Sequence, residues 1–296
     1  MTTAVTVSAW LRAATQALAD GTGWRAPGVE ASPRREAGWL LAGVLGRDQT
    51  WLLTWPEHAL TEAERARADD WLCRRLAGEP MAYLSGCQDF WSLPLRVTPA
   101  TLIPRPDTER LVELALQRLP TDAARRVLDL GTGSGAIALA VASERPQAEV
   151  TAIDRSAEAL AVARENGETL GLQVRWHCGS WFEPVRGERF DLVVSNPPYI
   201  DPADPHLAGL GHEPASALVA DEAGLADLRH LAVEAPEHLL PGGWLLLEHG
   251  HDQGAAVRAL LQAAGFDAVE TWQDYGGQDR VTGGRLSSGE EHAHAE

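Results

Sequence analysis

A regular succession of short apolar strands and helices after residue 125 constrains the fold of this chain more than any other feature of its sequence. Residues 127–130 and 150–154 are apolar enough to be buried strands, and helical patterns follow them at 136–143 and 157–170. Strands that alternate with helices predict a largely parallel sheet covered on both faces. We therefore expect an α/β fold with a doubly wound, mostly parallel sheet, and ligands bound beyond the carboxyl ends of its strands.

The same pattern continues toward the carboxyl terminus. Further strands fit residues 190–195, 244–248, 268–273 and 280–285, and a further helix fits residues 253–264. The domain that they complete is expected to span residues 105–286. The residues after it, 287–296, are polar and acidic and cannot build a packed core, so we expect a disordered tail there.

The residues before this domain have a different character. Apolar residues recur at helical spacing over 7–19, 32–45 and 61–76, and a Ser or Thr suited to helix capping begins the second and third of these segments. We interpret residues 1–78 as a small helical domain with a role in recognition or packing.

A linker is expected between the two domains. Residues 90–97 alternate between apolar and polar side chains and lie between Gly86 and Pro99, which predicts a β-hairpin within residues 79–104. A turn after Pro104 then opens a helix that runs to about Arg118.

A glycine-rich loop, Asp129-Leu130-Gly131-Thr132-Gly133-Ser134-Gly135, joins the first strand of the sheet to its helix. Glycine lets the backbone turn tightly and approach a ligand where a Cβ would collide, and the helix behind the loop offers free N–H groups. Asp154 ends the next strand, where a carboxylate can accept hydrogen bonds from ribose hydroxyls. The spacing Gly131-x-Gly133-x-x-Ala136 also fits a dinucleotide site, so this loop alone leaves a methyltransferase and an NAD(P) dehydrogenase open.

A second motif, Asn196-Pro197-Pro198-Tyr199, follows the strand expected at 190–195. Taken alone it is an ordinary turn sequence. In a sheet that also carries the glycine-rich loop, it predicts a site for a planar –NH₂ group. The side-chain carbonyl of Asn196 and the backbone carbonyl of Pro197 can accept the two N–H hydrogens, and Tyr199 can pack on the planar group.

Chemistry explains why such acceptors are needed. The lone pair of an amide nitrogen is delocalised into its carbonyl, which makes the nitrogen a poor nucleophile. Acceptors that fit the developing positive charge on nitrogen better than the planar ground state favour the transition state. The motif therefore indicates methyl transfer to an amide or amino nitrogen, in which positioning matters more than a strong base.

The charge of the chain limits its partners. Its formal net charge is −17 at pH 7, and all of its basic residues other than histidine are arginines, scattered along the sequence. A protein that grips nucleic acid broadly needs a concentrated basic face, so we expect no direct nucleic-acid partner. The sequence also lacks a secretory pattern and an apolar run of about 18 residues, which favours a cytoplasmic protein without a membrane partner.

No metal site is expected. The cysteines, Cys73, Cys87 and Cys178, lack zinc-site spacing and are interpreted as reduced thiols in or near the core. His249 and His251 are close in sequence, but nothing supplies further ligands at a metal-site spacing, so residues 248–251 are interpreted as the end of a strand.

Beyond these two motifs, several segments resemble the bacterial release-factor glutamine methyltransferase family, also called PrmC or HemK. The resemblance covers about residues 34–285. It includes FWSLPL at 90–95, TLIPRPDTE at 101–109, SNPPYI at 195–200, LEHG at 247–250 and DRV at 279–281. It implies a Rossmann-like class I methyltransferase domain that uses S-adenosylmethionine. The implied substrates are class-one peptide-chain release factors, methylated on the glutamine of their Gly-Gly-Gln loop.

The resemblance also implies roles for individual residues. The loop from Gly131 to Gly135 would line the methionine and ribose, Asp154 would hold the ribose hydroxyls, and Trp181 would stack near the adenine. Asn196 would contact the cofactor as well as the substrate. The residues implied at the site are Gly131, Thr132, Gly133, Ser134, Gly135, Asp154, Trp181 and Asn196 for the cofactor, and Asn196, Pro197, Pro198 and Tyr199 for the glutamine.

Two further segments have implied roles. Residues 103–108 would lie over the cofactor, and the helical domain would help to recognise the release factor. The family usually has an aspartate where this chain has Ser180. Because serine is the weaker acceptor, the resemblance implies looser binding of the adenine amino group.

Alternative functions share part of these features. A glutamine methyltransferase acting on a large-subunit ribosomal protein shares both motifs, but the hairpin and residues 101–109 favour the release-factor family. A DNA adenine or RNA guanine amino-methyltransferase would need a basic target-recognition domain. A dehydrogenase leaves residues 196–199 without a role.

Overall fold

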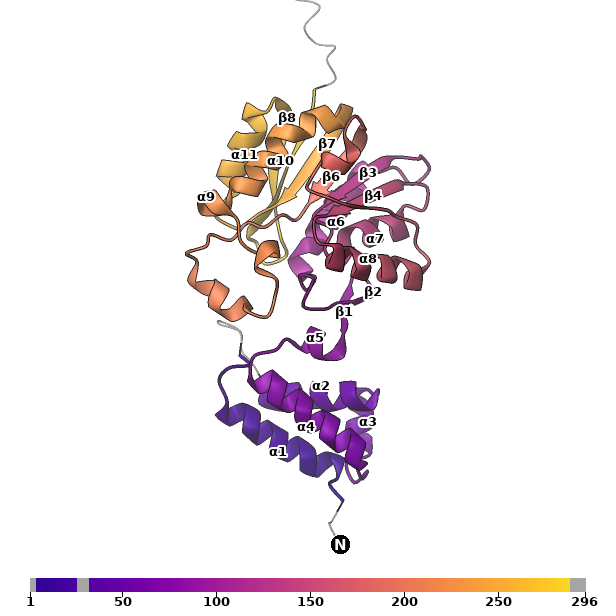
Figure 1. Ribbon diagram of the computed structural model, residues 1–296, viewed down its shortest axis with the longest axis vertical. Helices are drawn as coiled ribbons and strands as arrows, with labels where there is room; N and C mark the ends of the chain where they lie inside the picture. Colours follow the sequence, from indigo (N-terminus) through magenta and orange to yellow (C-terminus); the bar gives the residue numbers. More distant parts are fainter. Residues whose placement is uncertain (1–3, 26–31, 288–296) are drawn as a thin grey trace, which may run out of the picture. The chain divides into compact units, whose positions relative to one another are not determined.

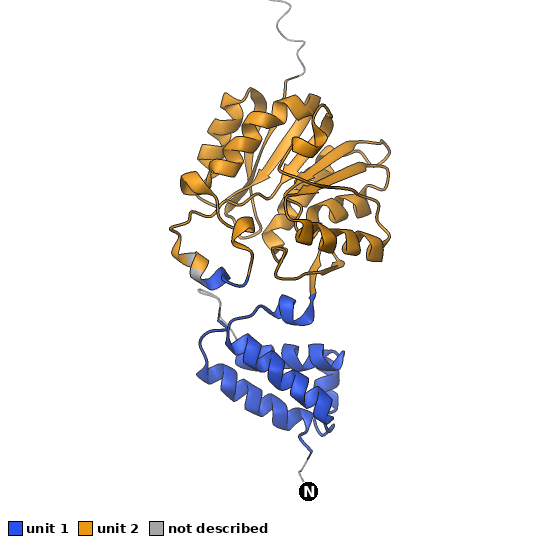
Figure 2. Ribbon diagram, viewed as in Figure 1, with its two compact units in different colours: residues 1–86, 208–212 blue, residues 87–207, 213–296 orange. Residues whose placement is uncertain are grey.

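The computed structural model describes residues 4–25 and 32–287 and divides the chain into two compact units (Figure 2). The first comprises Met1–Gly86 with the short segment Ala208–His212, and the second comprises Cys87–Leu207 with Glu213–Glu296. The boundary after Gly86 falls within the linker expected over 79–104. Of the tail expected to be disordered, all residues after Ser287 lie outside the described part of the chain.

The first unit is built from helices. They are α1 (Val7–Asp20), α2 (Pro33–Leu45), α3 (Gln49–Thr54), α4 (Glu62–Leu76) and α5 (Met81–Ser85) (Figure 1). The three longest lie where the sequence predicted helices. The sequence did not predict α3 and α5, because they are too short to show an apolar period.

Side-chain caps begin the longer helices, and an apolar core holds them together. Thr6, Ser32 and Thr61 each accept a backbone N–H of the first turn, and Thr61 forms a capping box with Glu64. The core contains buried residues from all five of these helices and from the segments between them, among them Trp10, Leu18, Trp24, Leu40, Leu41, Leu52, Ala68 and Leu84.

The second unit opens with the expected hairpin. Strands β1 (Cys87–Phe90) and β2 (Leu93–Arg96) pair antiparallel around Trp91 and Ser92, whose φ angles are 52° and 62°. Positive φ at both turn residues gives the twist that matches paired strands. The short turn η1 (Pro106–Thr108) then leads into α6 (Glu109–Arg118).

A seven-stranded sheet forms the centre of this unit (Figure 1). Its order is β5-β4-β3-β6-β7-β9-β8. The strands are β3 (Arg126–Leu130), β4 (Glu149–Asp154), β5 (Arg175–Cys178), β6 (Phe190–Ser195), β7 (Leu239–Glu248), β8 (Phe266–Gln273) and β9 (Asp279–Leu286). The expected doubly wound, mostly parallel sheet is confirmed: strands β3 to β7 are parallel, and only the edge hairpin of β8 and β9 is antiparallel.

Alternate residues of the central strands face opposite layers of helices, as the twofold period of a strand requires. Leu192 and Val194 of β6 belong to a core shared with α6 and α7 (Ala136–Glu144), whereas Val193 belongs to a core shared with α10 (Ala226–Glu234) and α11 (Gly254–Ala263). Helix α8 (Ala157–Leu170) packs its last residue against the first core.

The sequence did not predict every regular element of this unit, and it misplaced the cysteines. It did not predict β5, whose residues Arg-Trp-His-Cys lack a buried apolar run, nor the helices α9 (Asp221–Gly224) and α10. The cysteines are exposed, so the expectation that they lie in or near the core is wrong. Within the described residues no helix has both the length and the apolar character needed to cross a membrane.

The order of the strands creates a place for a ligand. From β3 the chain proceeds through β4 and β5 on one side and then returns to place β6 on the other side. The loops after β3 and β6 therefore leave the sheet in opposite directions, and a crevice opens between them at the carboxyl ends of the strands.

Candidate active site

The glycine-rich loop after β3 is held in a tight turn against β4. The backbone N–H groups of Gly131 and Thr132 both donate to Ile153 O, at 2.9 and 3.0 Å. Gly131, Gly133 and Gly135 have φ angles of +73°, +57° and +86°, which other residues adopt at a cost. The loop thus depends on glycine for its backbone conformation as well as for space.

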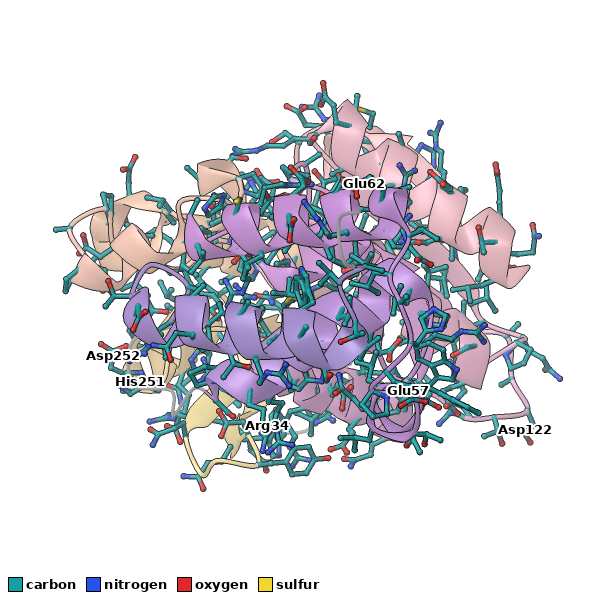
Figure 3. All side chains as sticks on the ribbon, turned by 90° about the horizontal axis from the view of Figure 1, so that it is seen from below. Arg34, Glu57, Glu62, Asp122, His251 and Asp252 are labelled. Atoms are coloured by element: carbon teal, nitrogen blue, oxygen red, sulfur yellow. The ribbon has the colours of Figure 1, made fainter. Side chains whose placement is uncertain are left out.

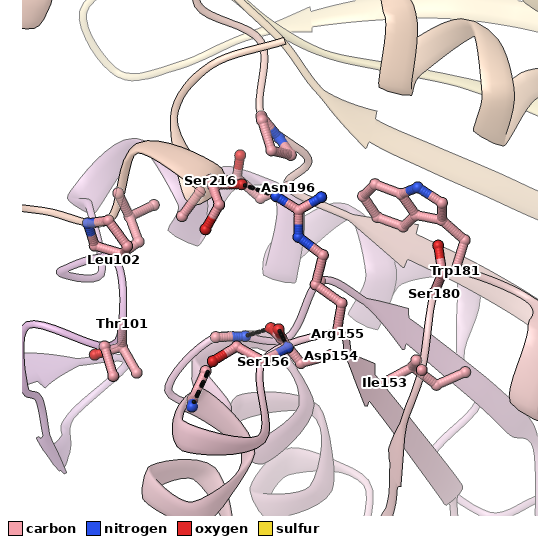
Figure 4. Close-up of a pocket in the computed structure, with 18 residues that line it drawn as sticks. Thr101, Leu102, Ile153, Asp154, Arg155, Ser156, Ser180, Trp181, Asn196 and Ser216 are labelled. Atoms are coloured by element: carbon pink, nitrogen blue, oxygen red, sulfur yellow. Dashed lines mark hydrogen bonds between the residues drawn. The ribbon is translucent and has the colours of Figure 1, made fainter.

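Asp154 lies at the end of β4 and joins this loop to the next helix. Its Oδ2 accepts from Gly133 N at 2.8 Å, and its Oδ1 accepts from Ser156 N at 2.9 Å (Figure 4). Each carboxylate oxygen can accept more than one hydrogen bond, so the side chain can still receive hydroxyl groups from the pocket that it lines.

Asp129 holds the loop from below. Its side chain is fully buried, and Oδ2 accepts from the Thr132 hydroxyl at 2.6 Å and from Ala138 N at 3.2 Å. Burial raises the pKa of Asp129 to about 7, against the opposing effect of these two donors. Asp129 belongs to the quoted motif, but sequence analysis gave it no role of its own.

The loop and Asp154 form one side of a pocket within the second unit (Figure 4). Thr101 and Leu102 stand on one side of this pocket, and Trp181 and Ser180 stand on the other. Arg155 reaches across, where its Nη2 donates to Ser216 O at 3.1 Å. The lining residues are Ala100, Thr101, Leu102, Gly131, Gly133, Ile153, Asp154, Arg155, Ser156, Ala159, Gly179, Ser180, Trp181, Asn196, Pro198, Pro214, Ser216 and Ala217.

Asn196 and Pro198 reach the same pocket from the end of β6. The Ser195 hydroxyl donates to Leu130 O at 2.7 Å, which ties the ends of β6 and β3 together. Asn196 Nδ2 donates to the Thr108 hydroxyl oxygen at 3.1 Å. Because the amide nitrogen is engaged in this way, the amide carbonyl of Asn196 is left to accept from a ligand.

Tyr199 is held at both its ring and its backbone. Its hydroxyl donates to Glu248 Oε1 at 3.3 Å, and the side chain of Gln253 donates to Tyr199 O at 3.0 Å. A Cβ on Gly224 would lie 2.1 Å from Tyr199 O, so only glycine fits there. The residues just before it, Glu222 and Ala223, have φ angles of 56° and 55°, a strained conformation of the kind found beside functional sites.

Glu248 lies beneath this motif, at the end of β7. It is 1 % exposed, and its Oε2 has no hydrogen-bond partner within the described residues. Burial raises the pKa of Glu248 to about 7, although Thr108, Arg280 and Tyr199 favour its charged form. Burial together with the Glu248 charge raises the pKa of Tyr199 above its usual range. A carboxylate at the carboxyl end of a strand is a signal that sequence analysis could have used, but Glu248 was interpreted only as the end of a strand.

The two histidines that follow Glu248 do not point to a common site. His249 is buried and bonded to Thr282 and to its own turn, whereas His251 is exposed at the periphery (Figure 3). Residues 4–25 and 32–287 contain no group of histidine, cysteine and acidic side chains that could hold a metal ion.

The sequence-derived site residues fall into two groups. Gly131, Gly133, Asp154, Trp181, Asn196 and Pro198 line the pocket. Thr132, Ser134, Gly135, Pro197 and Tyr199 do not line it, and Thr132, Ser134 and Pro197 are buried. Residues 100–102 line the pocket, and the segment 103–108 expected over the cofactor follows them directly without lining it. No individual role was predicted from the sequence for the side chains of Arg155, Thr108 or Glu248.

Comparisons with known proteins agree with this geometry. The family model "Methyltransferase small domain" matches residues 109–209, and "PrmC N-terminal domain" matches residues 9–86. A release factor glutamine methyltransferase of Salmonella typhimurium is 52% identical over 281 residues, which cover 94% of this chain and 98% of that protein. One of Pseudomonas aeruginosa is 54% identical over 257 residues, 86% of this chain and 93% of that protein.

A solved structure supports the fold independently. The crystal structure of a methyltransferase from Pyrococcus furiosus aligns with a TM-score of 0.52 at 20% identity and covers 77% of this chain and 100% of that one. At this identity the likeness shows the fold alone. The extent and identity of the sequence matches show more: the chain belongs to the release factor glutamine methyltransferase family.

Proposed function

We propose that this chain transfers a methyl group from S-adenosylmethionine to the side-chain amide nitrogen of the glutamine in the Gly-Gly-Gln segment of class-one peptide-chain release factors. The observation that carries the proposal is the place of Asn196, whose amide lines the pocket while its nitrogen is bonded to Thr108. The carbonyl is therefore available as the acceptor that an amide substrate needs.

The residues of the pocket fit the proposed donor. Gly131 and Gly133 leave its floor without side chains, Asp154 retains acceptor capacity for ribose hydroxyls, and the flat face of Trp181 suits an adenine. When bound there, the sulfonium group supplies an already activated methyl. The chain itself then has only to position the receiving nitrogen and exclude water.

Asn196 and Pro197 would position that nitrogen. The Asn196 carbonyl and the Pro197 backbone carbonyl would accept the two N–H hydrogens and favour a nitrogen with a localised lone pair. The nitrogen held in this way would take the methyl group, its new bond to carbon replacing the carbon–sulfur bond of the donor, which would leave as S-adenosylhomocysteine. One proton of the methylated nitrogen is lost to solvent, so no strong base is required at the site.

The partner follows from family membership and from the first unit. The curated relatives are named for release factors, and the helical unit matches the amino-terminal model of the family. We propose residues 1–78 as a recognition domain for that protein substrate. The absence of a nucleic-acid partner and a cytoplasmic location stay predictions.

The test is methyl transfer from labelled S-adenosylmethionine to a purified release factor, with a control whose Gly-Gly-Gln glutamine is replaced by alanine. We expect label on the wild-type factor and none on the control. Label on both would move the target to another residue. No label on either, with S-adenosylmethionine bound in calorimetry, would reject the release factor and turn attention to ribosomal protein. Calorimetry with NAD tests the alternative that the chain is a dehydrogenase. We expect no binding of NAD, and binding would favour that alternative.

A further inference from the structure

The side-chain amide of Asn196 has two possible orientations, and only one of them serves the proposed reaction. With its oxygen toward the pocket, the amide accepts a hydrogen bond from a substrate N–H. With its nitrogen toward the pocket, it would present its own N–H groups to the substrate N–H and could not accept from it. Nothing in the amide itself decides between the two, because its oxygen and nitrogen have nearly the same size. The decision must come from the group that the other end of the amide contacts.

That group is the Thr108 hydroxyl, 3.1 Å from Asn196 Nδ2. A hydroxyl has one hydrogen to donate and lone pairs with which to accept, so Thr108 can face either end of the amide. It presents its lone pairs to Asn196 only if its own hydrogen is directed elsewhere. Thr108 is 4 % exposed, so water does not readily take that hydrogen.

The neighbouring acceptor is Glu248. Thr108 favours the charged form of this carboxylate, and Oε2 of Glu248 is buried without a hydrogen-bond partner in the described chain. A buried anion with an unmet acceptor strongly attracts a nearby O–H. Tyr199 already donates to the other oxygen, Oε1, at 3.3 Å. Thr108 is thus the hydroxyl that can donate to the remaining oxygen, Oε2.

We propose that Glu248 is a positioning residue, which through Thr108 orients the Asn196 amide so that its carbonyl faces the substrate. The proposal rests on the proposed function for the meaning of that orientation. The same carboxylate anchors the Tyr199 ring, so one buried charge sets both ends of the Asn-Pro-Pro-Tyr motif. When Glu248 is protonated, its own O–H becomes a hydrogen-bond donor. Thr108 would then no longer donate to Glu248 and could donate to Asn196 instead, which would allow the Asn196 amide to reverse.

Burial and the charged groups around Glu248 together set the pH at which this reversal occurs. Arg280 lies on β9 and favours the carboxylate, while its own side chain is paired with Asp274 at 3.1 Å. Asp107 of η1 opposes the charge. Burial is the largest effect and brings the pKa of Glu248 to about 7. Wild-type protein should therefore lose the productive orientation as the pH falls below neutrality.

The chain offers an unusually direct probe, because it contains only two asparagines, Asn166 and Asn196. Asn166 is buried, and its side chain is fully engaged: Nδ2 donates to Arg96 O and Ser134 O, and Oδ1 accepts from Arg96 N. Protein labelled with ¹⁵N-asparagine therefore gives side-chain NH₂ signals from one test residue and one internal control. Asn196→Ala assigns them.

The first measurement is a pH titration of these signals between about pH 5.5 and 8.5, the range that spans the Glu248 pKa. We expect the Asn196 NH₂ signals of the wild type to shift with a midpoint near 7 while those of Asn166 stay constant. In Glu248→Gln the midpoint should disappear, and in Glu36→Gln, which alters a buried carboxylate of the first unit and adds no asparagine, it should persist. A wild-type Asn196 signal that does not titrate, or one that titrates equally in Glu248→Gln, would overturn the proposal.

The second measurement is the single-turnover rate of methyl transfer at saturating S-adenosylmethionine. Glu248→Gln and Thr108→Val should each lose about 10- to 100-fold, the scale of a misplaced catalytic dipole, and Thr108→Ser should recover most of the rate. The cofactor Kd should stay within about threefold, because neither side chain lines the pocket. Thr151→Val removes another buried hydroxyl of the same unit and should leave the rate unchanged.

Outcomes of the two measurements separate the proposals. If Thr108→Val transfers the methyl group at a rate within about twofold of the wild-type rate, the positioning role is overturned, even though the glutamine is methylated. A Thr108→Ser variant as slow as Thr108→Val would show that packing matters and the hydroxyl does not, which would also overturn the positioning role. If the wild type does not methylate the glutamine, the proposed function fails, while the titration of Asn196 still decides whether Glu248 orients the amide.

Discussion

Two buried carboxylates of the second unit, Asp129 and Glu248, support the two halves of the candidate site in different ways. Asp129 bonds to Thr132 and Ala138, within nine residues of itself in the chain. Glu248 bonds to Tyr199, 49 residues away, and its charged form is favoured by Thr108, which is farther still in the chain. Burial raises the pKa of each to about 7.

This contrast indicates that the cofactor side is built from β3, its loop and the adjacent strand β4, whereas the substrate side is built by contacts between elements farther apart in the chain. The loop around Gly131 takes its shape from glycine conformations and from neighbouring backbone groups. The Asn196–Tyr199 segment takes its shape from side chains on η1, β7 and the residues that precede α11. Substitutions should therefore affect cofactor binding on the first side and the rate of transfer on the second.

The largest effect is expected from Asn196→Ala. Removing the acceptor aimed at the substrate amide should lower the single-turnover rate by about 100-fold or more, the scale measured for a lost catalytic dipole. Because Asn196 is one of many residues that line the pocket, the cofactor Kd, measured by calorimetry, should rise by no more than about tenfold. A loss of cofactor affinity as large as the loss of rate would place Asn196 on the cofactor side and contradict the division into two sides.

Gly131→Ala should act on the other side. At a φ of +73° the new Cβ costs about 1–2 kcal/mol, and it takes space on the pocket floor. We expect cofactor binding about tenfold weaker, with the transfer rate restored at saturating cofactor. Gly46→Ala is the matched control, because Gly46 has a φ of +61° with nothing near its Cβ position and lies in the first unit. It should lower stability without weakening cofactor binding.

Ser180→Asp tests the cofactor side more finely. It introduces the carboxylate that the resemblance implies at this position, on a residue that lines the pocket and is exposed. A charged acceptor for the adenine amino group should tighten binding by about three- to tenfold. Ser180→Ala should change the Kd little, and an unaltered Kd in Ser180→Asp would show that Ser180 does not face the adenine.

The smallest effect is the pH dependence of stability through Asp129. Because its pKa is raised from 3.8 to about 7 by burial, the folded chain retains a proton that the unfolded chain releases between these values. Its contribution to the free energy of unfolding is complete below pH 3.8 and is lost as the pH rises through about 7. The stability of Asp129→Asn relative to wild type should therefore rise between about pH 5.5 and 8 in urea unfolding. A difference that is the same at both pH values would contradict the buried charge.

Local patterns predicted much of the fold. The alternation after residue 125 indicated the order of most strands and helices, and the helix over Ala157–Leu170 has the predicted bounds. Strand β5 and helices α3 and α5 escaped because their residues show no apolar period of their own, and tertiary pairing or packing stabilises them instead. The cysteines were misplaced because composition does not reveal which face of an element is buried.

Within the candidate site, the glycine-rich loop, Asp154 and the Asn-Pro-Pro-Tyr segment could all be identified from the sequence, because backbone conformation and strand ends are local properties. The folded structure was needed to show which of these residues line the pocket, and it added Arg155, Thr108 and Glu248. These contacts join residues tens of positions apart, and each depends on the order of the strands. A sequence specifies that order through the packing of the whole sheet, so no single motif contains it.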